Sequence, residues 1–344
     1  MEKIRIWKVI CVAMIPVALL VFWGGWRGSV TEVGDTIKIG VVIYRGDDAF
    51  ISTMAVALEN QAKLIGEELD KKIIMNIVDA KNNQGNVNAQ VDTFISGEYD
   101  AICINMVDRT VASSIVGKAK EADIPIVFFN REPVEEDLHI WNKTSYVGTD
   151  AREAGRLEGQ MVVDVYQETP ERLDKNGDGR VQYVILEGEE DHQDSLIRTE
   201  YSLKTITDSG IELQRLDRGI GNWMRSPAYE QMLLWLDKYR NSIEMVLSNN
   251  DEMAMGVIEA LREREMLENG PLIVGIDGGK DALEEIRQGN MWGTVVNDAD
   301  GQARVIIKIA CAYVKGENPE EKVPELNEKY AFIPHYAVTA EDLN

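Results

Sequence analysis

The run Ile37-Lys-Ile-Gly-Val-Val-Ile-Tyr44 (IKIGVVIY) decides the fold class of this chain. Apart from Lys38 and Gly40, every residue in it is hydrophobic. Such a near-continuous apolar run is typical of a strand in a parallel sheet whose two faces are both covered. A helical pattern follows at residues 50–67, and a second strand is predicted at 72–78. The chain therefore opens on a β-α-β unit.

The same alternation of strands and helices continues towards the C-terminus. Further strands are predicted at 101–104, 125–129, 181–186, 212–216, 244–247, 272–276 and 294–296, with an extended segment at 330–338. Further helices are predicted at 86–95, 111–120, 150–166, 195–208, 228–239, 253–264 and 303–314. This order predicts an α/β protein with two doubly wound parallel-sheet lobes in tandem.

Chain length and net charge indicate how many domains the chain forms and which partners it avoids. A chain of 344 residues exceeds what one hydrophobic core usually serves, and hydrophobic residues make up 44% of it. The net charge is −23. A body this acidic is repelled by phosphate backbones and anionic lipid surfaces, so we expect no nucleic-acid partner.

The N-terminal segment, residues 1–29, has the composition of an export signal. Lys3, Arg5 and Lys8 form a basic start, and residues 9–26 are uncharged. That length lies between a signal-peptide core and a full membrane-spanning helix, so a cleaved signal and an uncleaved anchor both remain open. Either way, we expect the body to lie in the periplasm or at the outer face of the cytoplasmic membrane.

Cysteines are scarce in this chain. Cys103 lies in a predicted strand and Cys311 in a late predicted helix. Two cysteines in so large a body do not make a disulfide framework, so both are predicted to be core residues.

A calcium-loop pattern stands between the predicted helix 150–166 and the strand 181–186. In the stretch 174–182, DKNGDGRVQ, oxygen side chains occupy loop positions 1, 3, 5 and 9, and a glycine occupies position 6, where the chain must turn. The four oxygen side chains belong to Asp174, Asn176, Asp178 and Gln182. Position 12, normally a bidentate glutamate, is Ile185. The stretch is either a solvated turn or a calcium loop whose last carboxylate comes from elsewhere.

Strand order offers a source for that carboxylate. In a doubly wound sheet of order 2-1-3, the first and third strands of a lobe are neighbours. Gln182 opens the strand 181–186 and Glu244 opens the strand 244–247, and both strands would start at the same sheet edge. Glu244 is therefore predicted to complete the calcium site, although an acid at a strand start is often only solvated.

Polar and aromatic residues gather at the predicted carboxyl ends of the strands, where doubly wound folds bind ligands. They include Asp48 and Phe50 after the first strand, and Trp223 in the loop after strand 212–216. Further strands lead to Asn130, His192, Asp194, Arg198, Asn250, Asp277 and Asn297. Acids and amides at such places are often only helix caps, and aromatic residues often only pack. Because so many strand ends carry polar or aromatic side chains of the same kinds, the pattern favours a binding site.

That chemistry suits a neutral polyhydroxylated ligand. Carboxylates and amides can hydrogen-bond pairs of adjacent hydroxyls, and aromatic faces can cover the C–H faces of a pyranose. The chain has no glycine-rich phosphate cradle and no basic cluster. Its histidines, at 139, 192 and 335, are too scattered to indicate a histidine metal site.

Five stretches of the chain resemble the type I periplasmic sugar-binding proteins that take galactose and glucose. They are IGVVIYRGDDAF (39–50), PIVFFNREP (125–133), YVGTD (146–150), SNNDEMAMG (248–256) and GTVVNDA (293–299). The resemblance covers residues 37–344 and implies two lobes joined by a three-segment hinge. It assigns 36–149 with 298–333 to the N-terminal lobe, and 150–297 with 334–344 to the C-terminal, calcium-binding lobe.

The resemblance also implies ligands, partners and activity. The ten polar and aromatic residues above would bind the sugar, with Phe50 and Trp223 on its two faces. Structural Ca²⁺ would be held by Asp174, Asn176, Asp178, Gln182, Glu244 and the carbonyl of Arg180. The protein would be a monomeric, non-enzymatic receptor that delivers D-galactose or D-glucose to the membrane subunits of an ABC importer, and in some settings to a chemoreceptor.

Three features depart from the family's pattern, and one of them is the N-terminal segment, which differs from an easily cleaved signal. Arg180 stands at a loop position where the family usually has a neutral residue. The run Glu189-Glu190-Asp191 adds negative charge near the cleft.

Three other functions were weighed. A membrane-tethered sugar sensor keeps the same site and is the main alternative. A sugar-responsive transcription regulator would need a basic helix-turn-helix where the chain has its apolar N-terminus. A glycoside hydrolase would use paired carboxylates such as Asp48 and Asp194, but a cleft closed around a monosaccharide leaves no room for a leaving group.

Overall fold

The strand predicted from IKIGVVIY is β1 (Thr36–Ile43), and it opens the part of the chain that the computed structural model describes, residues 36–343. The predicted export segment 1–29 lies outside the described residues. Within residues 36–343 there is no helix that combines the length and the apolar content needed to cross a bilayer.

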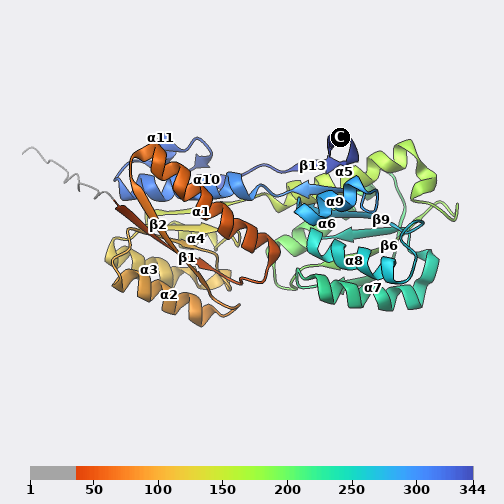
Figure 1. The fold of residues 1–344 in the computed structure, drawn as a ribbon, viewed down its shortest axis with the longest axis horizontal. Helices are drawn as coiled ribbons and strands as arrows, with labels where there is room; N and C mark the ends of the chain where they lie inside the picture. Colours follow the sequence, from red (N-terminus) through yellow and green to blue (C-terminus); the bar gives the residue numbers. More distant parts are fainter. Residues whose placement is uncertain (1–35, 344) are drawn as a thin grey trace, which may run out of the picture. The chain divides into compact units, whose positions relative to one another are not determined.

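The first lobe is built on a seven-stranded sheet of order β11-β12-β5-β4-β3-β1-β2 (Figure 1). Its other strands are β2 (Lys72–Asp79), β3 (Ala101–Ile104), β4 (Ile126–Phe129), β5 (Thr144–Gly148), β11 (Leu326–Asn327) and β12 (Tyr330–Phe332). Its helices are α1 (Ala49–Leu69), α2 (Gln84–Ser96), α3 (Ala112–Ala122), α4 (Glu135–Leu138), α10 (Ala299–Val314) and α11 (Pro319–Lys322). All strand pairs are parallel except β11 with β12.

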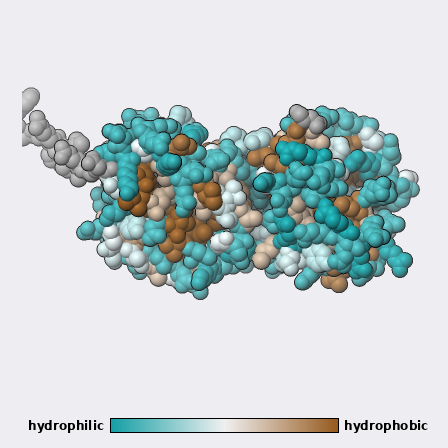
Figure 2. Space-filling view, viewed as in Figure 1, coloured by the Kyte–Doolittle hydropathy of each residue, from teal (hydrophilic) through white to brown (hydrophobic). Residues whose placement is uncertain are grey.

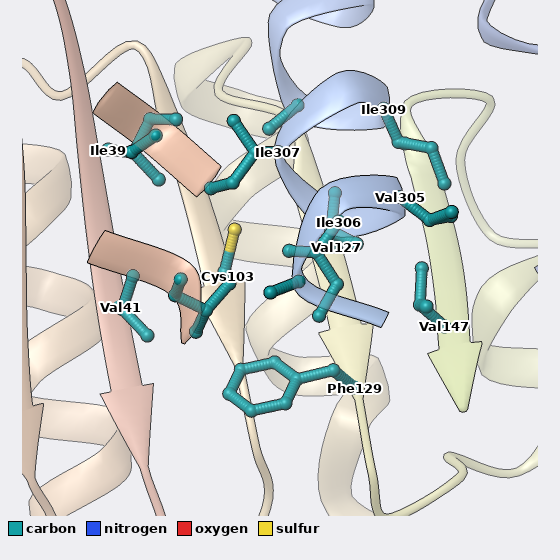
Figure 3. Close-up of a cluster of buried hydrophobic side chains, with 14 of the residues drawn as sticks. Ile39, Val41, Cys103, Val127, Phe129, Val147, Val305, Ile306, Ile307 and Ile309 are labelled. Carbon is teal, nitrogen blue, oxygen red and sulfur yellow. The ribbon is translucent and has the colours of Figure 1, made fainter. Parts of the chain in front are cut away.

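Helices cover both faces of this sheet, as the apolar run in β1 predicts. On one face, Ile39 and Val41 of β1 pack with helices α1 and α10. On the other face, Val42 packs with α2 and α3. Figure 3 shows the first cluster, in which strand side chains such as Val127 meet Ile306 of α10. Cys103 and Cys311 are both buried free thiols, so the prediction that they are core residues is confirmed.

The second lobe is built on a six-stranded sheet of order β13-β10-β9-β8-β6-β7. Its strands are β6 (Val181–Glu187), β7 (Leu213–Ile220), β8 (Met245–Ser248), β9 (Leu272–Asp277), β10 (Gly293–Val296) and β13 (Tyr336–Thr339). Its helices are α5 (Ala151–Glu168), α6 (Gln193–Asp208), α7 (Arg225–Tyr239), α8 (Asp251–Glu263) and α9 (Lys280–Arg287). Only β13 is antiparallel, at the edge.

The chain passes between the two sheets three times. The crossings join β5 to α5, β10 to α10 and β12 to β13. The predicted fold class is therefore confirmed: two doubly wound α/β lobes are joined by three segments. On the face that Figure 2 shows, most exposed side chains are hydrophilic, as the acidic composition leads one to expect.

Some elements differ from the sequence prediction. Strands β5 and β11 and helices α4, α9 and α11 were not predicted, and helices α2, α6, α7, α8 and α10 begin two to four residues earlier than expected. The early starts have a common cause in α8 and α10, because Asn250 and Asp298 cap them with side-chain oxygens that accept from Met253 N and Gly301 N.

Candidate functional site

All ten residues predicted to bind the ligand line one cavity of about 30 Å³. This is far below the range for small-molecule sites, roughly 300–1,000 Å³, so the walls must move apart to admit a ligand of that size. Phe50, Asp48 and Asn130 come from the first lobe, and the other seven come from the second. Tyr44 and Ile51 also line the cavity. The structure thus brings the predicted residues together, while their role as sugar ligands stays a prediction.

The carboxyl ends of parallel strands supply these side chains. Asp48 lies between β1 and α1, and Asn130 directly follows β4. In the second lobe, Asp277 ends β9 and Asn297 directly follows β10. Since parallel strands end at the same edge of their sheet, residues far apart in sequence reach one cavity.

Asp48 is held by two neighbours. Its Oδ1 accepts a hydrogen bond from Ile51 N at 3.0 Å and so caps α1. Its Oδ2 accepts from the hydroxyl of Tyr44 at 2.5 Å. The carboxylate is 7% exposed and has a fixed orientation before any ligand arrives.

Arg198 is the cation of the cavity and is only 4% exposed. Its Nη1 donates to the carbonyl oxygen of Asn249 at 2.8 Å. Carboxylate oxygens of Asp194 and Asp277 lie 3.7 and 3.9 Å from its terminal nitrogens, and no partner engages its Nε. Buried charges need partners to offset lost hydration, and here two carboxylates share one guanidinium.

Burial dominates the electrostatics of these carboxylates. It raises the pKa of Asp194 above its ordinary value, and the charge of Arg198 offsets this only in part. Burial also raises the pKa of Asp277 well above its ordinary range, again against Arg198. Both groups therefore gain from a ligand that donates hydrogen bonds to them, because such bonds stabilise the charged carboxylate.

His192 is present as a neutral ring with a defined donor. It caps α6, and its Nδ1 accepts from Asp194 N at 3.1 Å. Burial, then Arg131 and Arg198, lower its pKa well below the ordinary value. A neutral imidazole that accepts at Nδ1 carries its proton on Nε2, so the ring can donate one hydrogen bond.

The aromatic side chains that line the cavity include Phe50 at the start of α1 and Trp223 after β7, besides Tyr44. Trp223 is 7% exposed and has a left-handed backbone, with φ of 64°. Its ring makes an edge contact with His192, at 5.1 Å between centroids, and the guanidinium of Arg198 lies 5.8 Å from its centroid. The cavity therefore presents a rigid aromatic face beside hydrogen-bonding groups.

Backbone strain accompanies these positions. Asn130 has φ of 62° and Asp277 has φ of 128°, in addition to Trp223. Residues other than glycine seldom adopt positive φ, and the strain persists only where the surrounding structure imposes it. Asn130 and Asp277 lie where a strand gives way to a loop, which turns their side chains out of the strand direction.

Tyr44 and Asn249 act at the site without having been predicted. Tyr44 was counted only as the last residue of the first strand. Asn249 is fully buried and accepts from Gly188 N, and its carbonyl holds Arg198. One signal for it is the pair Asn249-Asn250 at a strand end, of which only Asn250 was assigned to the site.

The predicted calcium loop has the turn that its glycines indicate. Gly177 and Gly179 have φ of 71° and 83°. The carboxylate of Asp174 accepts from the backbone N–H of Asp178 and of Gly179, at 3.1 and 3.0 Å. The side-chain amide of Gln182 donates from Nε2 to Asp178 Oδ2 at 2.9 Å. The oxygen-bearing side chains of positions 1, 5 and 9 therefore fold inwards onto one another.

Glu244 lies against this loop, as strand order predicts. Strands β6 and β8 are neighbours, and Glu244 is 1% exposed. Its Oε1 accepts from Lys175 N at 2.7 Å and from Asn176 N at 3.2 Å, and its Oε2 accepts from Gln182 N at 2.9 Å. The donor set, carboxylate and amide oxygens without sulfur or imidazole, fits a hard cation such as Ca²⁺.

Two observations bear on whether this loop binds a metal ion. Among residues 36–343, no group of three or more His, Cys, Asp or Glu side chains is arranged to hold a metal. The side chain of Arg180 turns to Glu212, with Nε 3.4 Å from its carboxylate, and both are exposed. The arginine thus leaves only its carbonyl for the loop, and calcium binding stays a prediction.

Comparison with known proteins agrees with the fold. Residues 39–318 match the family described as "Periplasmic binding protein domain". The D-galactose/methyl-galactoside binding periplasmic protein MglB of Haemophilus influenzae is 35% identical over 308 residues, 89% of this chain and 90% of the relative. A putative rhizopine-binding protein of Rhizobium meliloti is 30% identical, over 92% of this chain and 93% of its own.

A solved structure extends the comparison. An ABC transporter solute binding protein from Bacillus halodurans with bound myo-inositol is 30% identical and has a TM-score of 0.73. The match covers 89% of this chain and 96% of that one. The ligands named for these three relatives are D-galactose or methyl-galactoside, a rhizopine and myo-inositol, so they differ from one another.

Proposed function

The chain belongs to the periplasmic binding protein family, a family of non-enzymatic transport receptors, and we propose that its ligand is D-galactose or D-glucose. The observation that supports this most strongly is the cavity, where three carboxylates, one arginine and two aromatic faces converge. A neutral sugar offers hydroxyl donors to the carboxylates and a C–H face to Trp223. An anionic ligand would face the carboxylates, which disfavour it.

We further propose the route that the sugar takes. It docks on one lobe, and the lobes then close about the three connecting segments and bury it, as hinge-bending receptors do. The membrane subunits of an ABC importer would accept the closed form. The acidic body and the basic, apolar N-terminus support a protein exported from the cytoplasm.

Calorimetry of the whole chain against a panel of ligands tests the choice of sugar. The panel is D-galactose, D-glucose, methyl-β-galactoside, D-ribose and myo-inositol. We expect the two hexoses to bind most tightly. Tighter binding of myo-inositol or ribose would overturn the proposed specificity, even if the site residues are right.

A variant tests the site itself. Asp194→Ala removes a buried carboxylate that faces the cavity and Arg198, so several charge-assisted bonds to the sugar are lost. We expect affinity for the tightest-binding panel member to fall by about 100-fold or more. An unchanged affinity would contradict the site assignment. Asp164→Ala, an exposed acid on α5, is the control.

We also propose that the loop 174–182 holds a structural Ca²⁺ together with Glu244. Asp174, Asn176, Asp178, Gln182 and Glu244 would supply side-chain oxygens and Arg180 its carbonyl. The contacts of Glu244 with the N–H groups of Lys175 and Gln182 support this, because they tie the loop to the start of β8. The ion would stabilise that junction, on the sheet edge opposite the cavity.

A further inference from the structure

Three charged side chains outside the predicted ligand set meet across the two lobes. Arg45 follows β1 and Arg131 follows β4 in the first lobe, whereas Glu189 follows β6 in the second. Arg45 Nη1 lies 3.3 Å from Glu189 Oε1, and Arg131 Nη2 donates to the other oxygen, Oε2. These three residues are called the cleft latch below.

The cleft latch is largely withdrawn from solvent. The side chains of both arginines are 12% exposed and that of Glu189 is 18% exposed. Glu189 begins the acidic run that sequence reasoning took as added negative charge, but two arginines from the opposite lobe neutralise it. Glu190, the next residue, is exposed. Ion pairs that are shielded from water interact more strongly than surface pairs.

The latch contacts the ligand cavity through Tyr44. The guanidinium of Arg131 lies over the Tyr44 ring, 4.3 Å from its centroid, and Arg131 Nη1 donates to the carbonyl of Val107 at 2.8 Å. The hydroxyl of Tyr44 donates to Asp48 Oδ2. A continuous set of contacts therefore runs from Glu189 in one lobe to the predicted sugar ligand Asp48 in the other.

Arg45 provides a second connection. Its Nη2 donates to the carbonyl of Asn222 at 3.2 Å, and Asn222 directly precedes Trp223. The same nitrogen lies 3.8 Å from Asp48 Oδ2. Arg45 thus contacts the neighbour of the aromatic cavity residue Trp223 and lies close to the polar cavity residue Asp48.

We propose that Glu189 and Tyr44 are positioning residues for the sugar: Glu189 fixes Arg45 and Arg131 across the lobes, and Arg131 in turn holds the Tyr44 hydroxyl on Asp48. The inference rests on the proposed function, since it concerns the same cavity. The cap of α1 already holds Asp48 Oδ1, so the latch acts on the bond from the Tyr44 hydroxyl to Asp48 Oδ2 when the lobes meet. The observed affinity then depends on the fraction of molecules in which the latch is closed.

The first test is calorimetry of Glu189→Gln with the tightest-binding hexose. This change keeps the size of the side chain and removes its charge. We expect about tenfold weaker binding, with a smaller response to added NaCl than the wild type shows, because the screened ion pairs are gone. Glu190→Gln makes the same charge change one residue later and is expected to leave affinity unchanged. Equal effects of the two variants would overturn the inference.

The second test is a double-mutant cycle with Tyr44→Phe, which removes the hydroxyl and keeps the ring. We expect Tyr44→Phe alone to weaken binding about tenfold. The double variant Tyr44→Phe/Glu189→Gln should weaken binding by clearly less than the product, about 100-fold, because both changes disturb one set of contacts. A full 100-fold loss would mean independent effects and would refute the relay through Arg131.

Small-angle scattering without ligand separates this inference from the proposed function. Glu189→Gln should enlarge the radius of gyration relative to the wild type and Glu190→Gln, because the lobes lose their ion pairs. If the wild type binds no panel sugar, the proposed function is refuted. The radii of gyration then still show whether Glu189 holds the lobes together. Equal radii for all three proteins would refute the latch whatever the sugar results.

Discussion

Gly188→Ala should weaken sugar binding by displacing Trp223. Gly188 follows β6 and is packed under the indole ring. A Cβ atom added there would lie 2.1 Å from Trp223 Cζ2 and 2.2 Å from Cε2 and Cη2. The backbone of Gly188 is not left-handed, so alanine meets no conformational penalty of its own and the effect is that of the added methyl group.

The size of the effect follows from this distance. Non-bonded carbon atoms rest at about 3.5–4.0 Å, so the ring must move away by about 1.4 Å or more. Trp223 cannot move freely, because His192 contacts its ring and Asn250 Nδ2 donates to its carbonyl. Aromatic pairs contribute about 0.5–1.5 kcal/mol beyond their buried area, and we expect loss of the Trp223 face to cost a similar amount, to which disturbed neighbours add. We expect affinity to fall about tenfold, which is about 1.4 kcal/mol.

Isothermal titration calorimetry with the tightest-binding hexose measures this loss. Thermal unfolding by circular dichroism shows that the variant is folded. Gly117→Ala is the matched control, since a Cβ at Gly117 on α3 meets no atom within 4 Å. A dissociation constant for Gly188→Ala within twofold of the wild type would show that Trp223 does not contact the sugar, and the stacking argument would be wrong.

Two further predictions concern buried acids. Burial raises the pKa of Glu158 to about 8 from an ordinary 4.5, so the unfolded chain releases its proton first and wild-type stability falls as pH rises between these values. The wild type should lose on the order of 3 kcal/mol of unfolding free energy between pH 5 and pH 8, as measured by urea unfolding, whereas Glu158→Gln should not show this loss. An equal loss in both proteins would contradict the prediction. Glu244→Gln should lower the melting temperature by several degrees in calcium and much less in EDTA. Equal losses in both buffers would speak against a bridging ion.

Sequence patterns predicted the elements whose apolar periodicity is strong. Strand β1 and strand β3 were predicted to within one residue, because a strand covered on both faces must be apolar throughout. Strand β5 was missed, since it begins with Thr144 and Ser145, which are fully buried. The Thr144 hydroxyl donates to the carbonyl of Leu138, and that of Ser145 pairs with Tyr313. Such partners come from tertiary structure and leave no local signal.

The candidate site was predictable for a topological reason. Parallel strands of one sheet end at one edge, so polar residues after each strand must meet there. Tyr44 was missed because its apolar ring reads as the last residue of a strand, while its hydroxyl finds Asp48 four residues later. The roles of Arg45 and Glu189 depend on how two lobes meet, which no pattern within either lobe records.

Capping and ligand binding look like rival explanations for the polar residues after each strand, yet one side chain can cap a helix and also line the cavity. Asp48, His192 and Asn250 each cap a helix and each line the cavity. A capping bond uses one acceptor of the side chain and fixes its rotamer. Ordering a free side chain on binding costs about 0.5–1.5 kcal/mol, and a capped one has already lost that freedom during folding. A helix cap at the carboxyl edge of the sheet is therefore a preorganised ligand, and its capping role strengthens its assignment to the site.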